Sequence, residues 1–223
     1  MTGSRISARS LLRETFPTTG SLYAPLLTIN FPNLILSAIN SWDNLGSAGG
    51  VFYIIYSFVA IPFLSGAMIF YTYRSLTRNQ VTVGQAFNQA NRRLLHLILV
   101  YIMFVGVVFV GFIALIIPGL YVSYRLIFSL YATAIDNSSP LDSLSSSWEL
   151  TKGRWWLVFR SSLLIIFVVS VPIVLIVLLI SSTGNLLATR LTINLLGFFT
   201  GPLIDVYFVL FYLRLRESAA TIQ

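Results

Sequence analysis

The sequence predicts an all-α, polytopic membrane protein that forms a single integral membrane domain over residues 1–223. Three observations predict it. First, 57% of the residues are hydrophobic and 9% are charged, whereas soluble domains carry about 25% charged residues. Second, several apolar runs are long enough to cross a bilayer. Third, the basic residues lie between and beyond these runs, mostly at ends that would face the same side of the membrane. A chain of this composition requires lipid as its solvent.

Six runs are predicted to cross the membrane. The run 51–73 contains 23 residues without a charge, and at ~1.5 Å per residue it covers a hydrocarbon core of ~30 Å. The first run is weaker, because Pro25 and Pro32 interrupt it and Asn30 places an amide at depth. A Pro-Gly pair at position 118 turns the third run into the fourth. The predicted spans are residues 22–40, 51–73, 94–117, 119–135, 157–180 and 191–213.

Three short amphipathic helices are also predicted, one before each pair of spans. The first lies in residues 1–20, where apolar residues recur at helical spacing between arginines, and the second covers residues 83–93. The third begins at Ser139-Pro140, which supplies a cap and a first-turn proline. This order predicts three repeated units. The first twenty residues lack the apolar core of a signal peptide, so no cleaved signal is expected.

The distribution of basic residues predicts the orientation, because cytoplasmic loops are enriched in Lys and Arg. Only Arg190 falls on the opposite side, and Arg125 lies within a span. Both termini and all three amphipathic helices are therefore predicted to be cytoplasmic. The other 12 of the 14 basic residues lie at the ends assigned to the cytoplasm: Arg5, Arg9, Arg13, Arg74, Arg78, Arg92, Arg93, Lys152, Arg154, Arg160, Arg214 and Arg216.

The stretch IPGLYVSYRLIFSLYATAID, followed by SPLDSLSSSWELTKGRWW and an apolar run, resembles the bacterial glycerophosphoryl diester phosphodiesterase membrane-domain family. The resemblance is specific over about residues 116–160 and rests on span count elsewhere. It implies a helical membrane module whose own role is undefined. The catalytic domain fused to some members has no counterpart here, so their activity is not carried over. The matching residues are Pro118, Gly119, Tyr121, Arg125, Ser147, Trp148, Gly153, Arg154, Trp155 and Trp156.

Two charges inside predicted spans suggest a buried ion pair. Arg125 lies 11 residues before Asp136, and Asp205 lies 9 residues before Arg214, so their depths differ by only ~3 Å. A charge in the membrane interior is normally paired or faces water. The leading hypothesis is that Arg125 and Asp205 hold the fourth and sixth spans together. The alternatives are that Arg125 binds an anionic lipid headgroup or substrate, or that it extends toward the outer face.

An aromatic and basic belt is predicted at the cytoplasmic ends of the spans. Indoles favour the headgroup level, and arginines there attract anionic lipid. Membrane anchoring is the simpler interpretation, and specific recognition of a phospholipid or glycerophosphodiester is the alternative. The belt and the basic pair before the third span form the predicted lipid interface: Trp148, Arg154, Trp155, Trp156, Arg92 and Arg93.

No catalytic triad, metal-ligand cluster or phosphate-binding loop appears in the sequence, and His96 is its single histidine. The prediction is a non-enzymatic membrane protein without a cofactor or metal, acting as an accessory, scaffold or lipid-interacting module. The alternatives are a small transporter or lipid permease and an accessory subunit of a respiratory or photosynthetic complex. The expected partners are membrane lipids, anionic ones included, with a larger membrane complex or a homo-oligomer also considered and nucleic acid excluded. The expected location is a bacterial inner membrane or a thylakoid membrane.

Overall fold

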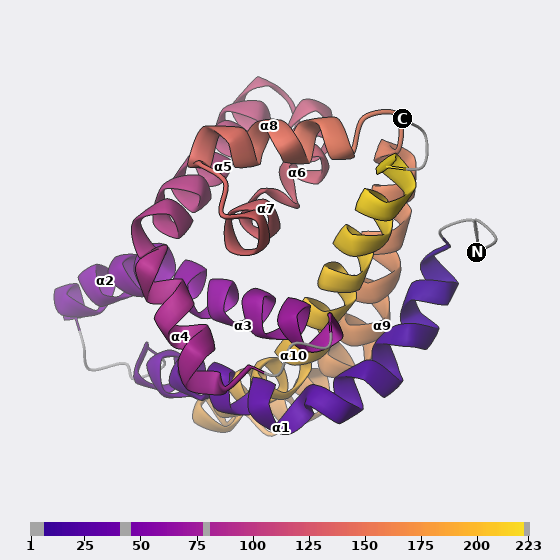
Figure 1. The fold of residues 1–223 in the computed structure, drawn as a ribbon. Helices are drawn as coiled ribbons and strands as arrows, with labels where there is room; N and C mark the ends of the chain where they lie inside the picture. Colours follow the sequence, from indigo (N-terminus) through magenta and orange to yellow (C-terminus); the bar gives the residue numbers. More distant parts are fainter. Residues whose placement is uncertain (1–6, 41–45, 78–80, 221–223) are drawn as a thin grey trace.

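The computed structural model describes residues 7–40, 46–77 and 81–220, in which every regular element is a helix (Figure 1). Arg5 and Arg78, which contributed to the predicted orientation, lie outside these residues. The elements are α1 (Ala8–Asn40), α2 (Gly46–Ile55), a π-helical turn η2 (Tyr56–Ala60), α3 (Ile61–Leu76), α4 (Val83–Arg92), α5 (Leu94–Ala114), α6 (Ile116–Leu126), α7 (Ser129–Asp136), α8 (Pro140–Leu150), α9 (Trp155–Ser181) and α10 (Leu186–Ala220).

Five helical segments among the described residues are long and apolar enough to cross a membrane. They are Ala8–Ile39, Gly50–Leu76, Leu94–Ala114, Trp155–Ser181 and Leu186–Ala220. They correspond to five of the six predicted spans. The prediction of an all-α, multi-pass membrane protein is therefore confirmed at this level.

The N-terminal amphipathic helix does not form a separate element, which differs from the prediction. Residues 8–40 make one helix that continues through Pro17, Pro25 and Pro32. The helix packs along α10, and it buries Leu11, Leu26 and Ile29. This continuous packing holds the helix together across prolines that each remove one backbone donor.

The predicted fourth span is also different, because residues 116–136 form two short helices instead of one. The break falls at Ile127 and Phe128. The two halves have different neighbours. Helix α6 packs against α5, α8 and α9, whereas α7 packs against α3, α5 and α8 and contacts α10 through the ring of Tyr131. A run of apolar residues can predict the length of a helix, but it does not reveal a break that other helices stabilise.

The other two segments that were predicted to be amphipathic are helical where the sequence predicted helices. Helix α4 begins with a capping box, in which the Thr82 hydroxyl accepts from the Gln85 N–H and the Gln85 side chain accepts from the Thr82 N–H. Helix α8 begins with the predicted cap, because the Ser139 hydroxyl accepts from the Asp142 N–H. Both starts are encoded locally.

The protein core lies where α3, α7 and α10 meet. Its largest fully buried side chains include Phe128, Tyr207 and Phe211. Helices α5 and α9 instead bury few of their apolar side chains, and Phe109, Ile113 and Phe167 are strongly exposed. Exposed apolar surface over whole helices is the pattern expected where a membrane protein meets lipid.

Candidate functional site

The break between α6 and α7 is held by hydroxyl groups of α8. The Arg125 carbonyl accepts from the Ser147 hydroxyl at 2.9 Å and from the Thr151 hydroxyl at 3.1 Å, while the Phe128 N–H donates to Ser147 Oγ at 3.1 Å. One turn earlier in α8, Ser143 accepts from Thr133 at 2.8 Å. The bonds of Ser147 and Thr151 satisfy backbone groups that lose their helical partners at the break, as an apolar environment requires.

The spacing of these hydroxyls was a signal that the sequence interpretation missed. Ser143, Ser147 and Thr151 recur every four residues, which places them on one face of α8, with Thr151 as its C-cap. All three are buried. Helix α8 therefore packs its hydroxyl face inward, whereas the apolar side chain of Leu141 is 68% exposed.

Arg125 extends from α6 next to this break. Its side chain is 3% exposed, and its guanidinium carbon lies 4.2 Å from the centre of a Trp148 ring and 5.9 Å from that of Tyr121. Across residues 7–40, 46–77 and 81–220, no carboxylate pairs with it and no hydrogen bond from its side chain is formed. The site thus contains a buried positive charge that packs against aromatic rings. None of the described carboxylates pairs with it.

Aromatic side chains continue from Arg125 to the start of α9. The Tyr121 ring lies 5.7 Å from Trp155, which stacks on Phe159 at 5.1 Å. The Trp155 indole N–H is buried and has no acceptor in the described part of the chain. Trp156 joins the same stack and is 57% exposed. The group formed by Tyr121, Arg125, Trp148 and Trp155 is called the Arg125 cluster below.

Arg154 is engaged within the protein, although the sequence suggested a lipid contact. Its guanidinium donates to the Leu215 carbonyl at 3.2 Å, to the Ser218 carbonyl at 3.3 Å and to the Ser218 hydroxyl. These bonds join the start of α9 to the C-terminal part of α10. Arg92 is exposed and Arg93 half-buried at the junction of α4 and α5.

The predicted pair of Arg125 and Asp205 is not formed, and this part of the sequence interpretation was wrong. Asp205 lies on α10 beside α1 and α3, whereas Arg125 packs under α8. Phe128 faces α10 instead, with ring centres 6.4 Å from Phe208 and 5.5 Å from Phe211. Similar depth in two spans was insufficient, because the break turns α6 away from α10.

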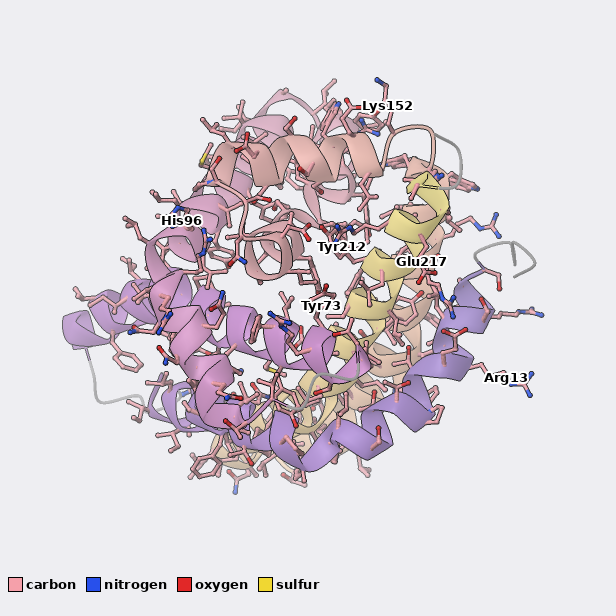
Figure 2. The ribbon with its side chains drawn as sticks, viewed as in Figure 1. Arg13, Tyr73, His96, Lys152, Tyr212 and Glu217 are labelled. Atoms are coloured by element: carbon pink, nitrogen blue, oxygen red, sulfur yellow. The ribbon has the colours of Figure 1, made fainter. Side chains whose placement is uncertain are left out.

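Charged residues near the ends of α1, α7 and α10 form pairs that the sequence did not suggest. Arg216 lies 2.7 Å from Asp136, which also accepts from the Tyr212 hydroxyl at 2.6 Å. Arg214 lies 3.0 Å from Glu14. Figure 2 shows Arg13, in contrast, pointing away from the helices. The N-terminal part of α1 and the C-terminal end of α10 therefore lie at the same end of the bundle.

A second polar site is a cavity of about 110 Å³ between α1, α3 and α10. Its polar lining comes from Asn30, Asn33, Ser65 and Asp205. Gly197 and Gly201 complete one wall with Asp205, at four-residue spacing along α10. A Cβ atom on Gly201 would lie 3.2 Å from the Asn30 amide nitrogen, so this glycine allows α1 to approach closely.

Pro202 explains why amides lie beside the cavity. Proline lacks an N–H, so the carbonyl four residues earlier, that of Phe198, loses its helical donor. The Asn30 amide donates to that carbonyl at 3.0 Å, and the Asn33 amide donates to Asn30 Oδ1 at 3.2 Å. The Tyr56 hydroxyl donates in turn to Asn33 Oδ1. The amide nitrogens are thus directed into the protein, which leaves oxygen lone pairs available.

One protein-family model matches a large part of the chain. Residues 80–215 match the family model described as Domain of unknown function (DUF7847). The chain belongs to the DUF7847 family. No curated protein matches the chain, and no solved structure matches it.

The DUF7847 match covers α4 to α9 and most of α10. It includes the whole Arg125 cluster and Asp205. The residues that complete the cavity from α1 and α3 lie before it. The Arg125 cluster is therefore internal to the DUF7847 region, whereas the cavity joins that region to the first two long helical segments.

Proposed function

We propose that this DUF7847 protein is a non-enzymatic, lipid-interacting membrane module that binds an anionic phospholipid headgroup at the Arg125 cluster. The observation that carries the proposal is the buried guanidinium of Arg125, which lacks an anionic partner among the described residues. An unpaired buried charge costs several kcal/mol, by an order-of-magnitude estimate. An anion from the lipid would remove that cost.

The chemistry of the cluster supports a phosphate-bearing ligand. A guanidinium can donate two parallel hydrogen bonds to a phosphate. The unpaired indole N–H of Trp155 is a second donor in the cluster. Trp156 presents an exposed ring at the same helix start, and tryptophan favours the headgroup level.

Lipid binding provides the direct test. Replacing Arg125 by glutamine should weaken binding of phosphatidylglycerol by about 1 kcal/mol or more, roughly fivefold, because one arginine contributes about that much. Native mass spectrometry of the purified protein, titrated with phosphatidylglycerol and with phosphatidylcholine, measures this. Arg13→Gln is the matched control, because it removes the same charge from an exposed position on α1. Equal lipid affinity of both variants would refute the site.

Catalysis provides a second check on the same proposal. The purified wild-type protein should not hydrolyse glycerophosphodiesters. Release of glycerol phosphate above that of a mock preparation would contradict a non-enzymatic role.

The proposed topology has six crossings, with α6 and α7 together making the fourth. Both termini, α4 and α8 would then face the cytoplasm of a bacterial inner membrane or the equivalent side of a thylakoid membrane. The ion pair of Glu14 with Arg214 supports an even number of crossings, because it joins the first part of α1 to the end of α10. The bonds of Arg154 to Ser218 bring the start of α9 to that same end.

Cysteine labelling tests this topology on a clean background, because the sequence contains no cysteine. Lys152→Cys, before α9, should react with a membrane-impermeant maleimide only in inverted vesicles. Thr183→Cys, in the turn between α9 and α10, should react in intact cells. Labelling of both variants from one side would exclude the proposed arrangement.

A small transporter or lipid permease is the second candidate, and the cavity beside Asp205 favours it. Against it, the predicted repeats all begin on the same side, whereas inverted repeats are common in transporters. Uptake of radiolabelled sodium or of a fluorescent phospholipid into proteoliposomes would favour transport over the lipid module. Co-migration with other proteins on a native gel would instead favour the subunit of a larger complex.

A further inference from the structure

The cavity between α1, α3 and α10 contains a carboxylate far from either end of its helix. Asp205 lies 15 residues from the nearer end of α10 (Leu186–Ala220), which corresponds to ~22 Å along the helix. Within the described ranges its carboxylate has neither a hydrogen bond nor an ion pair. A charge at such a position requires a partner or water.

The volume of the cavity matches a small hydrated ligand. About 110 Å³ holds several water molecules, since one water needs roughly 10–15 Å³ of such space. The surrounding side chains could not close the space, because Gly197 and Gly201 leave one wall without side chains. A Cβ atom on Gly197 would have no atom of another described helix within 4 Å.

The donor set of the cavity consists of oxygen ligands with a single negative charge. Asp205 supplies a carboxylate, Ser65 a hydroxyl, and Asn30 and Asn33 amide oxygens. The Asn30 and Asn33 amide nitrogens each donate within the protein, which fixes the orientation of both amides. Hard oxygen ligands suit hard cations, whereas transition metals prefer histidine or thiolate. No group of three His, Cys, Asp or Glu gathers in the described part of the chain.

We propose that this cavity binds one small monovalent cation of the size of Na⁺, with Asp205 as its counter-charge and the amide oxygens of Asn30 and Asn33 and the Ser65 hydroxyl as neutral ligands. One carboxylate balances one positive charge. A divalent cation would retain a net positive charge inside the membrane. The site is distinct from the Arg125 cluster, and the proposal does not depend on lipid binding there.

Thermal unfolding of the full chain in detergent micelles tests the proposal at fixed pH and ionic strength. Replacing choline chloride by sodium chloride should raise the unfolding midpoint of the wild type saturably, because the cation binds only the folded protein. Asp205→Asn should abolish this increase while unfolding at least as high as the wild type in choline. Asp142→Asn, which removes an exposed acid on α8, should retain the full sodium response.

A second variant keeps the carboxylate and fills the space. Gly197→Leu should also lose the sodium response, whereas Gly197→Ala should keep it, because a methyl group occupies little of the cavity. Broadening of the ²³Na resonance should report binding directly and should disappear with Asp205→Asn. Arg125→Gln should leave every one of these sodium responses unchanged, which separates this site from the lipid proposal.

Two outcomes would overturn the proposal. One is a wild-type protein that unfolds at the same midpoint in sodium and choline. The other is an Asp205→Asn variant that retains the sodium-dependent increase, since the effect would then arise elsewhere.

Discussion

Replacing Phe128 by alanine should lower the free energy of unfolding by about 2–4 kcal/mol. The ring is fully buried where α7 meets α10, with ring centres 5.5 Å from Phe211 and 5.8 Å from Tyr212. Apolar transfer contributes less here than in a soluble protein, because unfolded helices remain in lipid. The cavity left by the ring still removes dispersion contacts on every side.

The measurement is equilibrium unfolding in mixed micelles, with Phe167→Ala as the matched control. Phe167 lies on α9 and is 68% exposed, so the same truncation should change the free energy of unfolding by less than about 0.5 kcal/mol. Similar losses for the two variants would mean that Phe128 does not occupy a packed core.

Replacing Ser147 by alanine should destabilise the protein by about 2–4 kcal/mol, because two backbone groups at the helix break each lose a hydrogen bond. The Phe128 N–H would have no acceptor from α8, and the Arg125 carbonyl would keep only its bond from Thr151. A buried donor without a partner costs about 1–3 kcal/mol. The break itself should become mobile.

Ser146→Ala is the matched control, because the neighbouring hydroxyl is exposed on the same helix. It should leave the free energy of unfolding within about 0.5 kcal/mol of the wild type. Hydrogen exchange of the Phe128 amide should also rise in Ser147→Ala and stay unchanged in Ser146→Ala. A Ser147→Ala protein with wild-type exchange at Phe128 would show that α8 does not hold the break.

At the candidate site, only part of the environment of Arg125 could be predicted from the sequence. The presence of a charge inside the membrane followed from a single arginine in an apolar run. Its packing against Trp148 did not follow, because the sequence placed Trp148 in a lipid-facing belt. Its proposed partner, Asp205, did not follow, because depth along a helix gives no information on rotation around it. The cavity at Asp205 likewise depends on α1, α3 and α10 meeting, and on Pro202 freeing a carbonyl that Asn30 satisfies.

The sequence by itself determined the all-helical class, the five long helices and the starts of α4 and α8. These features depend on composition and on residues within one or two turns of each other, so they are encoded locally. Only the tertiary structure decided that residues 116–136 break at Phe128, that α1 is continuous, and that Arg125 and Asp205 occupy separate sites. Each of these outcomes depends on hydrogen bonds or packing between helices distant in sequence, such as Ser147 to Phe128 and α1 to α10.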